Sequence, residues 1–323
     1  MNIYHTIEHM PYLGDSCLTV GTFDGVHLAH QAIIQTLVAC SKEQGSSVVV
    51  TFHPHPQQVL NPDGGMVQML TTLDEKLALL ESLGVNHVLV LPFTKELAQL
   101  SPKQFIVDLL YQKIGFQSIF MGFNHAFGKK AEGSEELLKQ LGQQYHFVVK
   151  SVAAFKMSGQ IVSSTAIRQC LNEGDVNAAN LMLNRCYHMA GEVVSGMQIG
   201  KTIGFPTANL DINVKDKLIP ADGVYAVIGG WNGQMVPGMV NIGYRPTIEA
   251  GHRTIEVHLF DFENNIYGDR LDIHFVARIR DEKKFESLEA LRKQLEIDKL
   301  NSQQCLEDRS KEAFDGFNQR RKS

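Results

Sequence analysis

The stretch "LTVGTFDGVHLAH", Leu18 to His30, joins a short apolar run to a segment that carries two histidines three residues apart. The run is typical of a buried strand, and His27 and His30 follow it where a helix is expected to begin. Residues three apart share one face of a helix, so both imidazoles would lie beside the free N–H groups and the positive dipole end of its first turn. The pattern predicts an anion site, although an isolated H-x-x-H more often holds a capping histidine beside a solvated one.

Apolar runs of this kind recur through the first half of the chain at roughly the 30-residue spacing of a βαβ unit. Two capping patterns open helices between them, Thr72-Leu73-Asp74-Glu75 and Ser101-Pro102-Lys103-Gln104. Alternating strands and helices predict an α/β domain whose parallel sheet is covered on both faces, with ligands bound along the carboxyl edge of the strands. The strands are expected at Leu18–Phe23, Val48–Phe52, His87–Phe93, Ser118–Phe123 and His146–Val152.

The pattern of apolar and polar residues changes after Arg185. The runs that follow alternate apolar and polar residues, and turn signals such as Trp231-Asn232-Gly233 and Glu263-Asn264-Asn265 separate them. This alternation predicts antiparallel strands in a barrel or a sandwich. The strands are expected at Gly223–Ile228, Met235–Ile242, Thr254–Phe260 and Leu271–Ile279.

A helix is expected near the end of the chain, and the polar tail from Asn301 either continues it or frays. A chain of 323 residues exceeds the usual size of one core, so we expect two domains, 1–185 and 186–323. The apolar stripe that predicts the helix consists of Phe285, Leu288, Leu291 and Leu295.

Composition narrows the class of protein. No apolar run reaches the ~18 residues of a membrane span and the first residues lack the order of a signal peptide, so we expect a cytoplasmic protein. The formal net charge of -5 argues against broad binding to nucleic acid and leaves small charged substrates open. Five dispersed cysteines without a C-x-x-C predict neither a disulfide framework nor a zinc site. The oligomeric state is left open.

Three further polar segments are placed to join the histidines. Ser163-Ser164-Thr165 precedes Arg168 at the start of an expected helix. The free amides of the first turn and the bidentate guanidinium group of Arg168 could bind phosphate, although such hydroxyls are more often ordinary N-caps. The segment 51–56 follows the second predicted strand, and the segment 122–130 follows the fourth. Because the carboxyl ends of parallel strands meet at one edge, we expect the four polar segments to converge on one site.

The motifs in sequence order resemble a known family, the bacterial bifunctional riboflavin kinase/FMN adenylyltransferase, or FAD synthetase. The resemblance implies a Rossmann-like nucleotidyltransferase domain, then a six-stranded antiparallel barrel with riboflavin kinase activity and a C-terminal helix. It implies that riboflavin is converted to FMN and FMN to FAD, with ATP and Mg²⁺ used in both steps. The first half carries "GTFDGVHLAH", "TFHPHP", "LTTLDEKLALLESLGV", "FNHAFG" and "VSSTAIR", and the second carries "GKTIGFPTANLDI", "PADGVYAV", "NIGYRPT", "TIEVHLFDF" and "YGDRLDIHFVARIRDEKKFESLEAL".

For adenylyl transfer, the resemblance implies that His27 and His30 contact the ATP phosphates and stabilise the negative charge that develops there. It implies that Arg168 holds the triphosphate end. The nucleophile is an FMN phosphate oxygen that is already anionic, so the site needs preorganised donors and no general base. This chain departs from the family's H-x-G-H at Ala29, where helical backbone angles suit alanine and we expect activity to be retained. The residues implied to bind the nucleotide are Gly21, Phe23, Asp24, Asn124, Ser164 and Thr165.

For the kinase reaction, the resemblance makes Glu256 the base that accepts the proton of the riboflavin 5′-hydroxyl. Thr207 and Asn209 lie two apart, so both side chains point to one face of an extended segment, and the family match favours Mg²⁺ over a simple turn there. Gly196 to Thr202 is one residue short of a P-loop, and an extended segment follows it, so we reject that interpretation. The resemblance instead makes Gly200, Lys201 and Gly204 part of a loop over ATP or flavin.

Two other interpretations were weighed. Lys156-Met157-Ser158-Gly159 with the H-L-A-H stretch faintly resembles the signatures of class I aminoacyl-tRNA synthetases, but the acidic balance and the β-rich second half disfavour that group. A degenerate relative that binds flavin as a sensor or carrier would lack the polar residues named above, which are present here.

Overall fold

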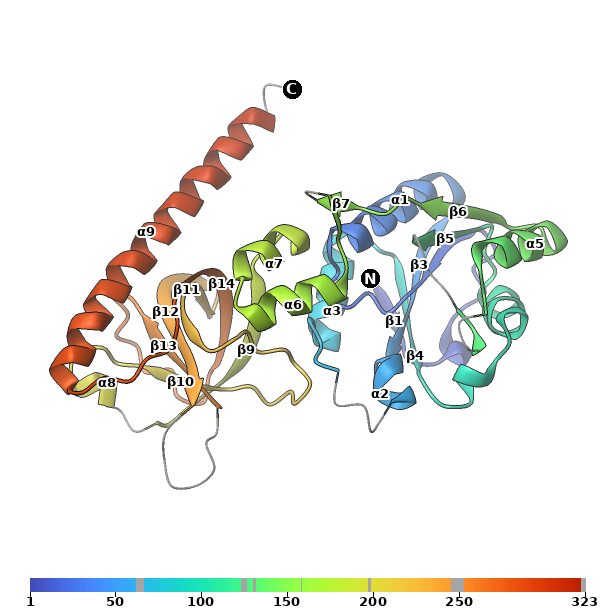
Figure 1. The fold of residues 1–323 in the computed structure, drawn as a ribbon. Helices are drawn as coiled ribbons and strands as arrows, with labels where there is room; N and C mark the ends of the chain where they lie inside the picture. The colour runs from blue at the N-terminus through green and yellow to red at the C-terminus, as the bar shows by residue number, and fades with distance from the viewer. Residues whose placement is uncertain are drawn as a thin grey trace. The chain divides into compact units, whose positions relative to one another are not determined.

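The computed structural model describes residues 1–61, 67–122, 127–129, 132–157, 159–196, 199–244 and 253–320 (Figure 1); for Gln44, Ile199, Lys201 and 310–320 it describes the backbone alone. The chain divides into two compact units, Met1–Ser164 and Thr165–Ser323. The first unit is α/β and the second is a closed barrel followed by a long helix, so the predicted fold class is confirmed. No helix within these described ranges is both long and apolar enough to cross a lipid bilayer.

The first unit is built on a six-stranded sheet with the order β1-β4-β3-β2-β5-β6, in which every neighbouring pair is parallel. Five strands overlap the predicted ones, and the three-residue edge strand β1 is additional. The strands are β1 (Asn2–Tyr4), β2 (Ser16–Val20), β3 (Ser46–His53), β4 (His87–Pro92), β5 (Ser118–Gly122) and β6 (Val148–Val152).

The strand order reverses at β2. The chain leaves β2 towards β3 and β4, and it later returns to the other side of β2 with β5 and β6. Ligands of open α/β sheets bind in the crevice outside such a switch point, at the carboxyl ends of the strands. The turn that carries Gly21 to His27 begins there, directly after Val20.

Helices cover both faces of this sheet (Figure 1). Val49 and Val50 are neighbours on β3 and lie in different apolar layers, as the alternation of a strand requires. Val49 packs in the layer of α1 (Leu28–Gln44) and α3 (Leu73–Ser82), and Val50 packs in that of η3 (Gln104–Tyr111) and α5 (Glu135–Tyr145). The shorter elements are η1 (Ile7–His9), α2 (Pro56–Leu60), η2 (Leu97–Gln99), α4 (Gln112–Ile114), β7 (Lys156–Met157) and β8 (Gln160–Ile161).

Both predicted helix openings are confirmed. Thr72 and Glu75 exchange side-chain and backbone hydrogen bonds at 3.1 and 3.2 Å, and Ser101 and Gln104 do the same at 2.9 and 3.3 Å. The second helix is wound as a π-helix over Gln104–Tyr111, which the sequence pattern did not indicate.

The second unit contains a closed antiparallel barrel with the order β10-β13-β12-β11-β14-β9. Among its buried side chains, the ring of Phe275 contacts the rings of both Tyr187 and Tyr225. The alternation predicted four of the strands, and the resemblance implied six. They are β9 (Tyr187–Val194), β10 (Ala208–Asp211), β11 (Gly223–Trp231), β12 (Gln234–Tyr244), β13 (Arg253–Leu259) and β14 (Arg270–Arg280).

The helices of this unit differ from the prediction in two details. α6 (Ser164–Glu173) and α7 (Val176–Leu183) lie at or after the division between the compact units, whereas the change of sequence pattern comes after them, at Arg185. α8 (Ile199–Thr202) is a single turn before β10.

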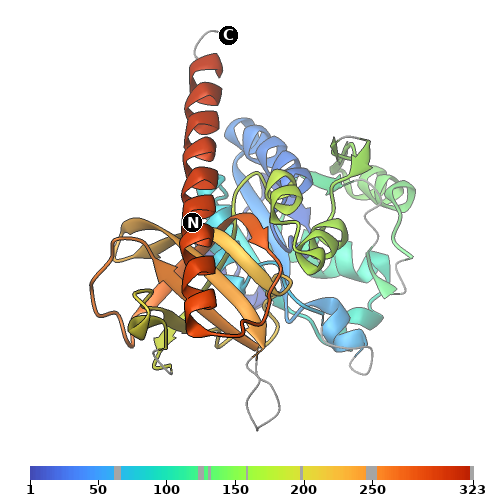
Figure 2. The ribbon, with the colours of Figure 1, turned by 60° about the vertical axis from the view of Figure 1, so that its left-hand side comes forward.

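α9 (Leu288–Arg320) continues beyond Asn301 and, as Figure 2 shows, runs past the barrel of its own unit. Phe285 was expected on the stripe of this helix but precedes it, where Arg280 and Lys283 cover its ring. The helix is fixed to β14 by Asp298, which is fully buried and accepts three hydrogen bonds from the Arg280 guanidinium at 2.7 to 3.1 Å.

Candidate functional site

The turn between β2 and α1 has an unusual backbone. Phe23 and Val26 have positive φ angles of 48° and 38°, which non-glycine residues rarely adopt and which cluster at functional sites. A Cβ at Gly21 would lie 3.1 Å from the Phe23 ring, so a larger residue there would press against that ring. The Gly21 amide donates to the carbonyl of Val50, which anchors the turn to β3.

Asp24 ties this turn to the segment before α3. Its carboxylate is 3% exposed and accepts hydrogen bonds from the backbone amides of Leu70 and Thr71 at 3.0 to 3.1 Å. The Thr71 hydroxyl donates to the same carboxylate at 3.3 Å and accepts from the Gly25 amide at 3.1 Å. The geometry therefore gives Asp24 a positioning function in the turn, and direct nucleotide binding by its carboxylate stays a prediction.

His27 and His30 form a stacked pair at the start of α1. Their ring centroids are 3.6 Å apart with an angle of 17° between the planes. His27 is the N-cap, and its Nδ1 accepts from the His30 amide at 3.4 Å. In a neutral ring, acceptance at Nδ1 leaves the proton on Nε2, so His27 presents an N–H donor on its other side. Phe23 is 2% exposed, and its ring packs edge-on against the His30 imidazole, with the two ring centroids 5.1 Å apart.

The start of α6 lies against this turn. The Ser164 hydroxyl donates to the backbone carbonyl of Asp24 at 2.8 Å, and Ser164 is the first residue of the helix. The structure thus brings together the N-terminus of α6 and the turn before α1. Thr165 and Arg168 follow on α6 within the second compact unit, and Asn124 lies outside the described residues.

Lys76 on α3 contacts the same turn, and the sequence interpretation missed it. Its side chain is buried, and its Nζ donates to the carbonyl of Thr22 and to the hydroxyl of Thr51, both at 3.1 Å. Burial lowers the pKa of Lys76 to about 8, although the negative charge of Asp24 opposes this shift. A signal was available, because Lys76 shares the buried face of its helix with Leu77 and Leu80.

In the second unit, the register of the barrel aligns three polar residues. Glu256 on β13 lies directly opposite Asn209 on β10 and opposite Asn241 on β12. Directly opposite residues share one face of a sheet. Ile255 and Val257 point into the barrel at 4% and 1% exposure, so the row of three lies on the other face. Asn241 was not singled out from the sequence, since only the strand register relates it to Glu256.

His258, two residues after Glu256 on the same strand, is buried. Its Nδ1 lies 2.7 Å from the carbonyl of Pro206, and its ring contacts Phe205 and Phe260. Burial lowers the pKa of His258. The predicted alternation holds for the other side chains, since Ile255, Val257 and Leu259 are all buried.

Two glycines leave space for the predicted cation ligands. A Cβ at Gly196 would lie 2.0 Å from the Asn209 amide nitrogen. One at Gly200 would lie 2.1 Å from the Phe205 carbonyl oxygen and in ordinary contact, at 3.4 Å, with the Thr207 hydroxyl. The Gly200 carbonyl accepts from the amides at 203 and 205, and Gly204 has a left-handed φ of 86°. The Thr207 hydroxyl and the Asn209 amide offer neutral oxygens, which fit a Mg²⁺ that takes its other ligands from nucleotide phosphates and water. The side chain of Lys201 is outside the described part of the chain.

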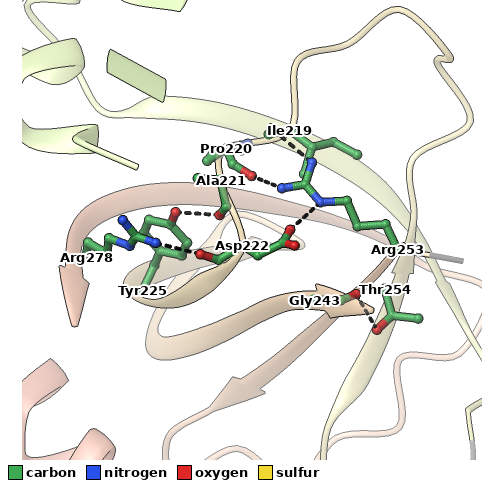
Figure 3. A network of polar contacts seen from close by, with 9 residues as sticks. All are labelled: Ile219, Pro220, Ala221, Asp222, Tyr225, Gly243, Arg253, Thr254 and Arg278. Atoms are coloured by element: carbon green, nitrogen blue, oxygen red, sulfur yellow. Dashed lines mark hydrogen bonds and ion pairs between the residues drawn. The ribbon is translucent and has the colours of Figure 1, made fainter. Parts of the chain in front are cut away.

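A polar network fixes the loop 219–222 beside β13 (Figure 3). Arg253 donates to the Asp222 carboxylate at 2.7 Å, to the carbonyl of Ile219 at 3.2 Å and to that of Pro220. Arg278 donates to the Asp222 carbonyl at 2.7 Å, and the Tyr225 hydroxyl donates to the carbonyl at 221 at 2.6 Å. Burial raises the pKa of Tyr225 to about 12, so its hydroxyl stays a donor. The strand that carries Glu256 is thus braced by a loop of the same unit.

Two family models match this chain, each over a different part of it. The profile described as FAD synthetase matches residues 10–166, and that described as riboflavin kinase matches residues 183–306. A bifunctional riboflavin kinase/FMN adenylyltransferase of Bacillus subtilis (strain 168) is 38% identical over 290 residues, which cover 88% of this chain and 90% of the relative. The protein of the same description from Escherichia coli (strain K12) is 35% identical over 302 residues, with 93% and 95% covered. A crystal structure titled as a macrolide-efflux protein from Streptococcus pneumoniae aligns with a TM-score of 0.86 and 29% identity, covering 93% of this chain and 98% of that one.

Proposed function

Since the chain belongs to the bifunctional riboflavin kinase/FMN adenylyltransferase family, we propose that the two reactions are divided between the residues of its two sites. The protein is an FAD synthetase that phosphorylates riboflavin to FMN and adenylylates FMN to FAD, with ATP as the co-substrate of both steps. We assign adenylyl transfer to the turn between β2 and α1, and phosphorylation to the row Asn209, Glu256 and Asn241. The proposed functional boundary stays near Arg185, which keeps α6 with the first reaction.

In adenylyl transfer, a phosphate oxygen of FMN attacks the α-phosphorus of ATP, and the bond to the departing pyrophosphate breaks. His27 and His30 would donate to the phosphates, where the first-turn amides and the dipole of α1 add to the positive potential. The stacked geometry supports this assignment, because the two rings are held in place before a ligand arrives. Ser164, Thr165 and Arg168 would hold the triphosphate end, and Asn124 would add a polar contact.

In the kinase reaction, the riboflavin 5′-hydroxyl attacks the γ-phosphorus of ATP, and ADP leaves. Glu256 would accept the hydroxyl proton, which makes the alcohol a competent nucleophile. Thr207 and Asn209 would hold Mg²⁺, which when bound neutralises charge on the nucleotide phosphates. The cross-strand pairing of Asn209 with Glu256 is the observation that supports this assignment most, because the proposed cation ligand and the proposed base would then be neighbours. Gly200, Lys201 and Gly204 would form the loop over the nucleotide.

Two single substitutions test the division of labour. His30→Ala should abolish formation of FAD from supplied FMN and leave formation of FMN from riboflavin unchanged, whereas Glu256→Gln should do the reverse. Each variant is incubated with Mg-ATP and one flavin, and FMN and FAD are separated by chromatography. The second activity of each chain is its internal control for folding. Loss of both activities in a folded His30→Ala protein, or full kinase turnover in Glu256→Gln, would contradict the assignment.

A further inference from the structure

Lys76 is a buried cation that the reactions described above do not use. It is 7% exposed, and lysine is almost never buried to this extent without a specific partner. Its ammonium group donates to the Thr22 carbonyl and to the Thr51 hydroxyl, and that hydroxyl also donates to the Thr22 carbonyl at 3.1 Å. One backbone carbonyl is therefore held by two donors, one from α3 and one from β3.

The carbonyl that Lys76 holds directly precedes the strained residue of the turn. The peptide plane between Thr22 and Phe23 sets the φ angle of Phe23, which is 48°. The ring of Phe23 in turn lies edge-on against His30 at 5.1 Å. A strained backbone conformation persists only where several surrounding contacts hold it in place. The ammonium group of Lys76 provides one of the contacts that hold the conformation of Phe23. A chain of contacts thus joins Lys76 to the second imidazole.

Stability alone does not account for a cation at this position. Burial penalises the ammonium form, as the lowered pKa of Lys76 indicates, and an apolar side chain of similar length would avoid that cost. Asp24 is the charged group of the turn that faces Lys76, but its carboxylate hydrogen bonds go to residues 70 and 71. The contacts of the ammonium group itself are directed at the turn.

We propose that Lys76 is a positioning residue for adenylyl transfer, which holds the Thr22 carbonyl so that the turn presents His30 to the nucleotide. The inference rests on the proposed assignment of His30. It predicts a lower turnover of the transferase and an unchanged kinase rate, because both hydrogen bonds of the Lys76 ammonium group go to residues of the first unit.

The test uses the full chain with Lys76→Met, and with Lys42→Met as the control at an exposed lysine of α1. We expect Lys76→Met to lower kcat of FMN adenylylation on the order of 10- to 100-fold, with smaller changes in KM and with kinase turnover unchanged. Lys42→Met should leave both activities unchanged. Unchanged adenylylation in folded Lys76→Met, or an equal loss in both reactions, overturns the proposal.

A pH profile separates positioning from simple structural support. Because the pKa of Lys76 is lowered to about 8, adenylylation by the wild type should decline as pH rises through that value, relative to the kinase activity of the same chain. Lys76→Arg stays charged and should lack this decline even where its maximum is lower. The same decline in Lys76→Arg overturns the proposal, and this comparison decides the matter if Lys76→Met does not fold. Full adenylylation by His30→Ala would instead refute the proposed function on which the inference rests.

Discussion

Gly196→Ala is expected to impair the kinase reaction selectively. An added Cβ would lie 2.0 Å from the Asn209 amide nitrogen, whereas ordinary contact begins near 3.4 Å, so the amide must move by 3.4 − 2.0 = 1.4 Å. That atom is the end of a flexible side chain, so the barrel should keep its fold while the amide is displaced. A displacement of about 1 Å in a positioned group costs on the order of 100-fold in rate, or about 2.7 kcal/mol of barrier.

The assay measures kcat/KM for phosphorylation of riboflavin at several Mg²⁺ concentrations, and formation of FAD from FMN by the same preparation. Phosphorylation should fall about 100-fold and recover in part at high Mg²⁺, while FAD formation stays constant. The matched control is Gly230→Ala on β11, where an added Cβ meets nothing nearer than 3.4 Å. A kinase rate in Gly196→Ala equal to that of this control would remove Asn209 from the proposed site.

Two further outcomes are expected. Ala29→Gly should change the rate of adenylylation by less than ~10-fold. It should lower the free energy of unfolding by roughly 0.5–1 kcal/mol, because residue 29 lies in the first turn of α1 and glycine is a weaker helix former than alanine. A gain of more than ~10-fold in steady-state FAD synthesis would show that the methyl group obstructs the nucleotide. The stability of the wild type relative to Lys76→Met should rise with pH above about 8, since the folded chain binds that proton less tightly than the unfolded chain, whose lysine has a pKa near 10.5. The slope should be about 1.4 kcal/mol per pH unit in urea unfolding, and a difference that is independent of pH contradicts it.

Features set by residues close together in the sequence were predicted well. The capping boxes at Thr72 and Ser101 involve residues three apart, and both formed as expected. Strands were found where apolar runs were long enough to be distinct. β1 and β10 were not predicted from the pattern, because three or four residues carry too little alternation to separate a strand from a loop. β9 was also missed, although its eight residues alternate between buried and more exposed positions.

Features set by the packing of distant segments could not be predicted from the sequence. The position of Lys76 on the helix face of Leu77 and Leu80 could have indicated its burial. Its partner, the Thr22 carbonyl, follows only from the packing of α3 against the turn. Asn241 is related to Glu256 only by the register of β12 and β13, and a shift by one residue would place it on the other face. The resemblance to a family named the reactive side chains but not the groups that hold them.

FMN is the product of the kinase step and the substrate of the transferase step, so the first site must release it and the second must bind it. In the proposed kinase site, the side chains of Thr207 and Asn209 are neutral. Once Glu256 releases the proton that it accepted, its carboxylate would lie beside the newly formed phosphate and the like charges would repel. At the start of α1, the incoming phosphate joins a triphosphate, and the combined charge meets amides, a helix dipole and the imidazoles of His27 and His30. Under the proposed assignment, the charges of the kinase residues would favour release of FMN, and those of the transferase residues would favour its binding. This preference depends on the chemistry of each site and would hold for any arrangement of the two units.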